Sequence, residues 1–146
     1  MGERILIRKP AAADALALSH LMGELGYPSQ PEEIIARLTA LDRFPDALTL
    51  VAELEGRVVG AMTTHVIPAI HVSPRVAMLT VLVVADELRG RGIGRELVDR
   101  AEAFAREHGA TKISLTSALH RTAAHGFYKL LGYEHTGVRL VKELHS

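Results

Sequence analysis

Apolar residues recur at two different spacings along the chain, and each spacing predicts one type of element. Between residues 18 and 25 they follow the i, i+3, i+4, i+7 spacing of a helix with one buried face. Gly26 should end this helix, and Pro31 suits the first position of a second helix. Residues 3–10 precede them as a short strand that its last residue, a proline, stops. The N-terminal part of the chain therefore predicts a strand followed by two helices.

The middle of the chain has the composition and spacing of strands. Residues 48–67 are typical of two strands joined at Glu55-Gly56, and such a two-residue loop favours an antiparallel hairpin. Residues 75–84 predict a third strand. Its last four residues are all apolar, so we expect both faces of that end to be covered.

Beyond the third strand, helical and strand patterns alternate. An apolar stripe predicts a helix over residues 93–105 with its cap at Gly109. A strand over residues 112–117 and a short helix over residues 122–131 should follow. Residues 133–144 are expected to form a last strand or strand pair.

The order of these elements predicts an α/β fold in a single domain that spans residues 1–146. The strand–helix–strand unit over residues 75–117 should be a right-handed crossover whose two strands are parallel. The hairpin should contribute an antiparallel pair. We therefore expect a mixed, mostly antiparallel sheet flanked by about four helices.

Composition and charge narrow the classes of function. The 17 basic and 17 acidic residues cancel, which argues against general nucleic-acid binding, because that binding rests on many phosphate contacts. The chain has no cysteine, which excludes disulfides, cysteine–zinc sites and a cysteine nucleophile. The eight histidines show no His-Glu-x-x-His motif and no i, i+4 pair, so we expect no metal site. No apolar run has the length of a signal peptide or a membrane span, and a cytoplasmic location is expected.

The segment ELRGRGIGREL, residues 87–97, joins a predicted strand to a predicted helix. Backbone N–H groups at a helix N-terminus have no partner within the helix, so such a terminus binds phosphate, and glycines allow close approach. The dinucleotide fingerprint needs glycine at positions 1, 3 and 6, and this spacing fails here. The nucleotide-triphosphate loop with Gly-Lys-Ser/Thr is also missing. Two interpretations remain for this segment, an anion site and an exposed arginine–glycine turn. A nucleic-acid contact is less favoured, because no aromatic residues interleave with the arginines.

The pattern Arg-x-x-Gly-x-Gly over residues 89–94 resembles the pyrophosphate loop of the GCN5-related N-acetyltransferases (GNAT), which bind acetyl-CoA. Residues 123–133, AAHGFYKLLGY, resemble the family's second landmark, an Ala-x-x-x-Tyr helix followed by glycine and an aromatic residue. The order of the predicted elements also fits the family. The resemblance implies a GNAT-like fold whose central β-α-β unit binds acetyl-CoA.

The same resemblance implies an activity. The enzyme would move an acetyl group from acetyl-CoA to a primary amine of a small molecule or a protein. Because the chain has no cysteine, direct transfer in a ternary complex is favoured over an acyl-cysteine intermediate. The alternative is an acyl-CoA-binding sensor or regulatory module with little or no catalysis. Family members are often dimers, so a homodimer is a further expectation.

The resemblance also implies roles for individual residues. The backbone of residues 82–84 would hydrogen-bond the pantetheine, and residues 89–95 would hold the pyrophosphate. Tyr128 would be the catalytic residue, protonating the departing thiolate or contacting its sulfur. A phenol with a pKa of about 10 can protonate the anion of a thiol with a pKa of about 8.5. The expected cofactor-binding residues are Leu82, Val83, Val84, Arg89, Gly90, Arg91, Gly92, Ile93, Gly94, Arg95, Arg121, Ala124, Phe127 and Tyr128.

Two positions depart from the family pattern. Arg121 stands where many members have an asparagine that contacts the cofactor, and it is a candidate pantetheine or phosphate contact. Thr80 and Val81 stand where many members have a glutamate base. A water relay without a dedicated base is one alternative. Three histidines are the other candidate proton acceptors, because histidine titrates near neutrality: His65, His71 and His120. Glu24 and Tyr27 are candidates for lining the acceptor site, whose amine the sequence does not identify.

Overall fold

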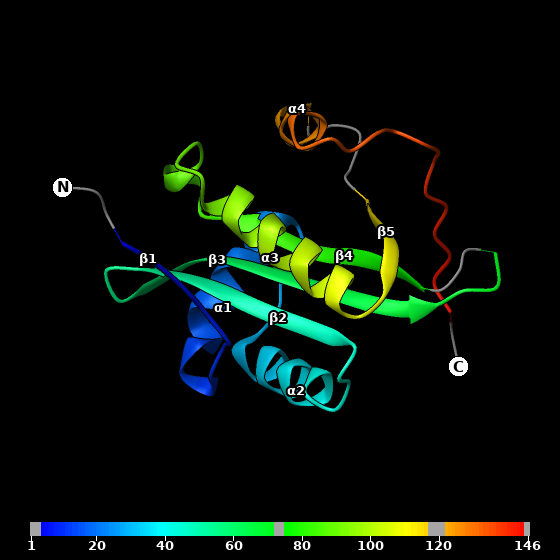
Figure 1. Ribbon diagram of the computed structural model, residues 1–146. Coiled ribbons are helices and arrows are strands. Elements are labelled where there is room, and N and C mark those ends of the chain that lie inside the picture. Colours follow the sequence, from blue (N-terminus) through cyan, green and yellow to red (C-terminus); the bar gives the residue numbers. More distant parts are fainter. Residues whose placement is uncertain (1–3, 72–74, 117–121, 145–146) are drawn as a thin grey trace. The chain divides into compact units, whose positions relative to one another are not determined.

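The computed structural model describes residues 4–71, 75–116 and 122–144 (Figure 1). The chain divides into two compact units, Met1–Leu115 and Thr116–Ser146. The first unit holds a sheet with helices on both faces. Its elements are β1 (Ile5–Arg8), η1 (Ala12–Asp14), α1 (Ala15–Leu25), α2 (Pro31–Leu41), β2 (Ala47–Leu54), β3 (Arg57–Pro68), β4 (Arg75–Val84), η2 (Asp86–Leu88), α3 (Ile93–Glu107) and β5 (Ala110–Leu115).

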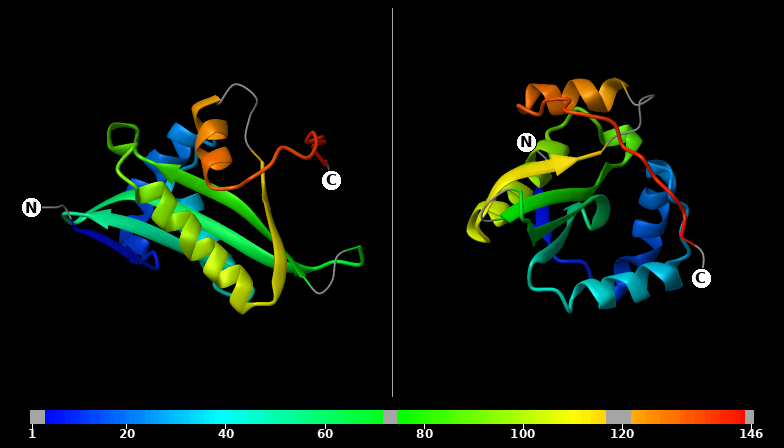
Figure 2. Two further views of the ribbon diagram at one scale, coloured as in Figure 1. Left: turned by 45° about the horizontal axis from the view of Figure 1, so that its top comes forward. Right: turned by 90° about the vertical axis from the view of Figure 1, so that its right-hand side faces the viewer.

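The sheet of the first unit has five strands in the order β1-β2-β3-β4-β5. The first three pairings are antiparallel, and only β4 and β5 pair in parallel, across the α3 crossover. Helix α3 lies on one face of the sheet, and α1 and α2 lie on the other (Figure 2). The predicted α/β fold with a mixed, mostly antiparallel sheet is confirmed.

Local sequence signals determine the ends of several elements. Gly26 takes a left-handed conformation with φ 105° and closes α1, as predicted. Pro31 is the first residue of α2. Glu55 and Gly56 have φ values of 50° and 80°, and they join strands whose end residues pair directly. Positive φ at both central residues of a two-residue loop gives the twist that a hairpin needs, so the predicted hairpin is confirmed.

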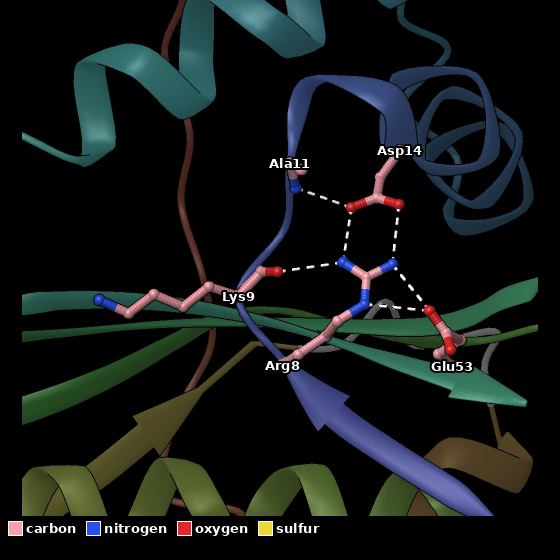
Figure 3. Close-up of polar contacts among 5 residues, drawn as sticks. All are labelled: Arg8, Lys9, Ala11, Asp14 and Glu53. Carbon is pink, nitrogen blue, oxygen red and sulfur yellow. Dashed lines mark hydrogen bonds and ion pairs between the residues drawn. The ribbon is translucent and has the colours of Figure 1, made fainter. Parts of the chain in front are cut away.

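One guanidinium links the end of β1 to the segment before α1 and to β2 (Figure 3). Arg8 donates to both carboxylate oxygens of Asp14, at 2.8 and 2.9 Å, and to Glu53 Oε1 at 3.1 Å. One Asp14 oxygen also accepts the Ala11 N–H at 2.7 Å. Hydrogen bonding to Arg8 is the largest cause that lowers the pKa of Asp14 below its usual value. We call Arg8, Asp14 and Glu53 the arginine clamp.

One buried cluster lies between α3 and the sheet. The predicted apolar stripe of α3 is confirmed, since its side chains are almost completely buried. They are Ile93, Leu97, Val98, Ala101 and Ala105. From the sheet, Val66 and Ala77 form a buried cluster with Ala105 of this helix. The burial of the stripe holds the start of α3 tightly to the strands, which matters for the site described below.

The second unit contains α4 (Thr122–Leu130) and the segment that follows it. Gly132, with φ 94°, lies just after the helix. Residues 133–144 have no regular secondary structure, so the prediction of a last strand there is wrong. Val138 and Leu140 are 82% and 90% exposed. An apolar pattern can identify a segment that is able to pair, but a strand also needs a partner ladder, and the pattern says nothing about that partner.

Candidate donor-binding site

Strand β4 carries a bulge in its middle. Thr63 of β3 lies opposite Val81, whereas the next β3 residue, Thr64, lies opposite Leu79. Thr80 is therefore an extra residue in β4, and its hydroxyl donates to the Thr63 carbonyl at 3.3 Å. A bulge bends its strand and increases the local twist, which re-aims the residues that follow.

Among the described strands, the last part of β4 has a partner on one side only. The parallel ladder with β5 runs from Arg75 to Leu79 and stops there, at Leu115 of β5. Residues 81–84 continue to pair with β3, but no strand described in this unit pairs with them on the other side. We call residues 82–84 the strand edge. Because each backbone carries both donors and acceptors, this edge offers hydrogen bonds to an extended ligand.

The glycine loop, residues 89–95, leads from η2 into α3 and includes the first three residues of that helix. Gly90 and Gly92 both have φ of 84°, a left-handed conformation that costs other residues about 1–2 kcal/mol. A Cβ at either position would meet no atom within 4 Å. Glycine is therefore needed here for backbone conformation and not for lack of space. Buried side chains of Leu88 and Ile93 hold the two ends of the turn.

The first backbone amides of α3 are not used within the helix. Gly92 is the N-cap, and no side chain caps the helix. The first intrahelical bond runs from Glu96 N–H to the Gly92 carbonyl at 3.1 Å. The amides of Ile93, Gly94 and Arg95 precede that bond, so they have no acceptor in the helix. With the positive end of the helix dipole, they form an anion-binding geometry.

Charged side chains surround this terminus. The side chains of Arg89, Arg91 and Arg95 are exposed. Arg89 pairs with Asp86 at 2.7 Å, and both side chains are more than half exposed, so this pair contributes little to stability. Solvent-exposed guanidinium groups remain able to exchange such a partner for a phosphate, which they bind in a bidentate manner.

The predicted site residues fall into two groups, one in each unit of the chain. All predicted residues from 82 to 95 lie in the first unit, along β4 and the turn into α3. Ala124, Phe127 and Tyr128 lie on α4 in the second unit. Half-buried Tyr128 makes edge-on ring contacts with Phe127 and Tyr133, with centroids 5.3 and 5.8 Å apart. Arg121 lies outside the described residues.

Two of the three candidate histidines are described. His65 lies on β3, opposite Met78 of β4, and burial lowers its pKa below the ordinary value. The adjacent Val66 packs with Phe104 of α3, so strand alternation puts His65 on the opposite face of the sheet. His71 is exposed after β3. His120 lies outside the described residues.

The predicted acceptor-lining residues lie at the end of α1. Glu24 is half-buried on that helix, and Tyr27, in the turn that follows, is 59% exposed. A residue that the sequence patterns missed is Gly60, a buried glycine inside β3 that lies beside both the strand edge and α3. A glycine within a strand pattern is the signal that would have found it, because it indicates close approach of another group.

The described residues were also compared with the requirements of a membrane span and of a metal site. None of the helices described is long and apolar enough to cross a membrane. Nor do the described residues contain a group of three or more histidine, aspartate or glutamate side chains suited to a metal ion.

The fold and this geometry define an α/β protein with an anion-binding loop where an open strand edge meets a helix. The family model described as the acetyltransferase (GNAT) family matches residues 16–133. The chain therefore belongs to the GNAT acetyltransferase family, as its loop and helix motifs indicated. It is an acetyl-CoA-dependent N-acetyltransferase, which confirms the predicted enzyme class and donor; a non-catalytic acyl-CoA sensor is not favoured.

Individual relatives support this assignment. The chain is 33% identical to the aminoalkylphosphonate N-acetyltransferase of Salmonella typhimurium over 89% of this chain and 82% of that protein. It is 31% identical to the N-acetylaspartate synthetase of Rattus norvegicus over 64% of this chain, but spans only 30% of that protein. A solved aminoglycoside N-acetyltransferase in complex with CoA has a TM-score of 0.84 at 16% identity, covering 100% of this chain and 98% of the other. That last likeness concerns the fold.

Proposed function

We propose that this acetyltransferase binds acetyl-CoA along residues 82–95 and acetylates a small primary amine that carries an anionic group. The observation that carries the donor site is that the open strand edge is followed, after residues 85–92, by the N-terminus of α3, which no side chain caps. An extended pantetheine needs alternating hydrogen bonds, and a pyrophosphate needs convergent donors. These two requirements match the two neighbouring features in that order along the chain.

In this proposal the pyrophosphate oxygens accept hydrogen bonds from the backbone N–H groups of Ile93, Gly94 and Arg95. The positive end of the α3 dipole favours the negative charge there. The side chains of Arg91 and Arg95 add full positive charges. Because both are exposed to solvent, each contributes modestly to the affinity for the pyrophosphate. The chain as a whole is neutral, so the attraction is local to this loop. Backbone groups of the strand edge hydrogen-bond the pantetheine amides.

Chemistry follows by direct attack of the amine nitrogen on the thioester carbonyl. The C–N bond forms, the C–S bond breaks, the amine loses one proton and the CoA thiolate gains one. Tyr128 is proposed to supply the thiolate proton from its phenol. Tyr128 belongs to the helix motif that identified the family, which supports this role.

For the proton that the amine loses, we favour His65 over the other two histidines. The family glutamate is absent at Thr80 and Val81, which leaves the position of a base open. Burial lowers the pKa of His65, so its imidazole is neutral at pH 7 and able to accept a proton. Its register position, opposite Met78, is close to the Thr80 bulge. Transfer through one water molecule satisfies the same requirement.

The acceptor class is inferred from two relatives. Their names indicate an aminoalkylphosphonate and aspartate as acetylated amines. Both are small primary amines that carry anionic groups. The first relative matches across 89% of this chain, so the similarity includes the α1–α2 region with Glu24 and Tyr27. We therefore propose a phosphonate- or carboxylate-bearing amine as acceptor.

The donor site is tested by calorimetric titration with CoA and with pantetheine, which lacks the pyrophosphate. The double variant Arg91→Gln/Arg95→Gln should weaken CoA binding about tenfold, which corresponds to about 1.4 kcal/mol, and leave pantetheine binding unchanged. Arg106→Gln is the matched control, because Arg106 lies in the last turn of the same helix. The donor site would be overturned if Arg106→Gln weakened CoA binding as much as the double variant does. It would also be overturned if the double variant weakened CoA and pantetheine binding equally.

The acceptor class is tested by thiol release from acetyl-CoA with three amines: an aminoalkylphosphonate, aspartate and a lysine peptide. The two anionic amines should give the higher kcat/KM. A preference for the peptide would reject the proposed class while leaving the donor site intact.

We also propose that both units form one catalytic domain. The match to the family model runs across the boundary between them, from residue 16 to residue 133. Calorimetric unfolding should then show one transition whose calorimetric and van't Hoff enthalpies agree. Two separated transitions would contradict this arrangement.

A further inference from the structure

Gly60 lies in the interior of β3, opposite Val84, and is buried. A Cβ built on it would lie 3.2 Å from the Val83 carbonyl oxygen, 3.3 Å from Ile93 Cγ2 and 3.3 Å from Leu97 Cδ1. Such distances are tighter than nine in ten real Cβ contacts, so the neighbours would have to shift by a few tenths of an ångström. The shift cannot be taken up by one flexible side chain, because one neighbour is backbone.

These three contacts reach both halves of the proposed donor site. Val83 belongs to the strand edge, and its carbonyl lies on the side of β4 that faces β3. Ile93 is the first residue of α3, and its amide is one of the proposed pyrophosphate donors. Leu97 is the next residue along the same buried stripe of the helix. Gly60 therefore lies where β4 and the start of α3 approach one strand.

Backbone conformation does not explain a glycine here. Gly60 is not among the residues with positive φ. Glycine in a strand interior is destabilising relative to alanine, so without a packing reason alanine would be the better residue. Protein interiors are close-packed, and one added methyl group moves the elements around it.

We propose that Gly60 is a positioning residue that sets the spacing between the strand edge and the glycine loop, so that one CoA molecule can reach both. This inference rests on the proposed donor site. A side chain at residue 60 separates the two features without removing any group from either. Each feature keeps its own hydrogen bonds, but the distance between them no longer suits a ligand that spans both.

The proposed role predicts a loss of affinity for CoA alone, whereas a general disturbance of the fold would also weaken binding of the two fragments of CoA. Pantetheine engages only the strand edge, and a nucleoside diphosphate such as ADP engages only the glycine loop. In Gly60→Ala each fragment should bind within about twofold of wild type. CoA, which bridges both features, should bind at least tenfold more weakly, and KM for acetyl-CoA should rise by a similar factor. KM for the amine should stay unchanged.

Gly23→Ala is the matched control. Gly23 lies within α1, has no positive φ, and a Cβ there meets nothing within 4 Å. This variant should bind CoA and both fragments as wild type does. If Gly60→Ala fails to fold, Gly60→Ala/Leu97→Val is compared with Leu97→Val, because the shorter side chain removes the Leu97 Cδ1 contact. The same selective loss of CoA affinity is expected in that pair.

Three results would overturn the proposal. The first is unchanged CoA affinity in Gly60→Ala, and the second is an equal loss for CoA and both fragments, which indicates local damage. In either case, a normal response of the Arg91→Gln/Arg95→Gln variant shows that the donor site stands and only the positioning role fails. The third is no response of that arginine variant, in which case the donor site is wrong and the positioning role falls with it.

Discussion

Replacing Asp14 by asparagine should destabilise the protein by about 2–3 kcal/mol. The Asp14 carboxylate accepts two N–H groups of Arg8, at 2.8 and 2.9 Å, and the Ala11 amide at 2.7 Å, and its side chain is only 11% exposed. Asparagine keeps the shape but loses the charge and turns an NH₂ group toward one of these donors. Breaking a buried ion pair costs about 3–5 kcal/mol, and the remaining Arg8–Glu53 pair and partial exposure of Arg8 reduce that figure.

Thermal and urea unfolding measure this loss directly. For a chain of this length about 1 kcal/mol shifts Tm by about 2–4 °C, so Asp14→Asn should lower Tm by about 4–12 °C. Asp46→Asn is the matched control, because Asp46 pairs with one arginine, Arg75, at 3.2 Å, and both side chains are more than a third exposed. Such an exposed pair contributes about 0–1 kcal/mol.

The pH dependence adds a second check on the arginine clamp. The pKa of Asp14 is lowered in the folded protein, so the unfolded chain takes up its proton first as pH falls. The stabilisation is complete above the unfolded aspartate pKa of about 3.9 and is lost as pH falls below it, through the folded pKa. The difference between wild type and Asp14→Asn should therefore be constant from pH 7 to about pH 5 and shrink below about pH 4. Equal destabilisation by Asp46→Asn, or a difference that persists unchanged at pH 2, would refute this reasoning.

Two further predictions concern catalysis. Tyr128→Phe should lower kcat by about 100-fold with CoA affinity unchanged, because general acid catalysis typically contributes about 10²–10⁴-fold; turnover at the wild-type rate would remove Tyr128 from the mechanism. His65→Gln should abolish the acidic limb of the kcat/KM profile. Since the pKa of His65 is lowered, the wild-type limb should lie below the ordinary histidine value of about 6.5, where the imidazole takes up its proton. An identical limb in the variant would assign it to another group.

The ends of elements that depend on a few adjacent residues were predictable from the sequence. Gly26 ends α1, Pro31 begins α2 and Glu55-Gly56 forms the two-residue hairpin, as expected. Each depends on the φ values that a residue allows and on helical or strand periodicity. Both properties are determined by a residue and its neighbours in the sequence. The glycine loop was predictable for the same reason, because its conformation and its position before α3 are local properties.

Relations between distant segments were not predictable in this way. Residues 133–144 have the composition of a strand, yet no strand forms there. The Thr80 bulge comes from the pairing of β4 with β3, and the open strand edge comes from the point where the β5 ladder stops. Periodicity within one segment contains no information on register against another segment.

The sequence by itself determined the order of elements, the glycine turn at the start of α3 and, through its two motifs, the enzyme family. Only the tertiary structure decided that no described strand of the first unit pairs with residues 82–84 on one side, and that His65 and Val66 face opposite sides of the sheet. It also decided that a Cβ at Gly60 would meet both β4 and α3. The physical reason is the range of the interactions. Turn and helix signals depend on bonded neighbours, whereas the open edge and the close approach at Gly60 depend on how segments far apart in the chain pack together.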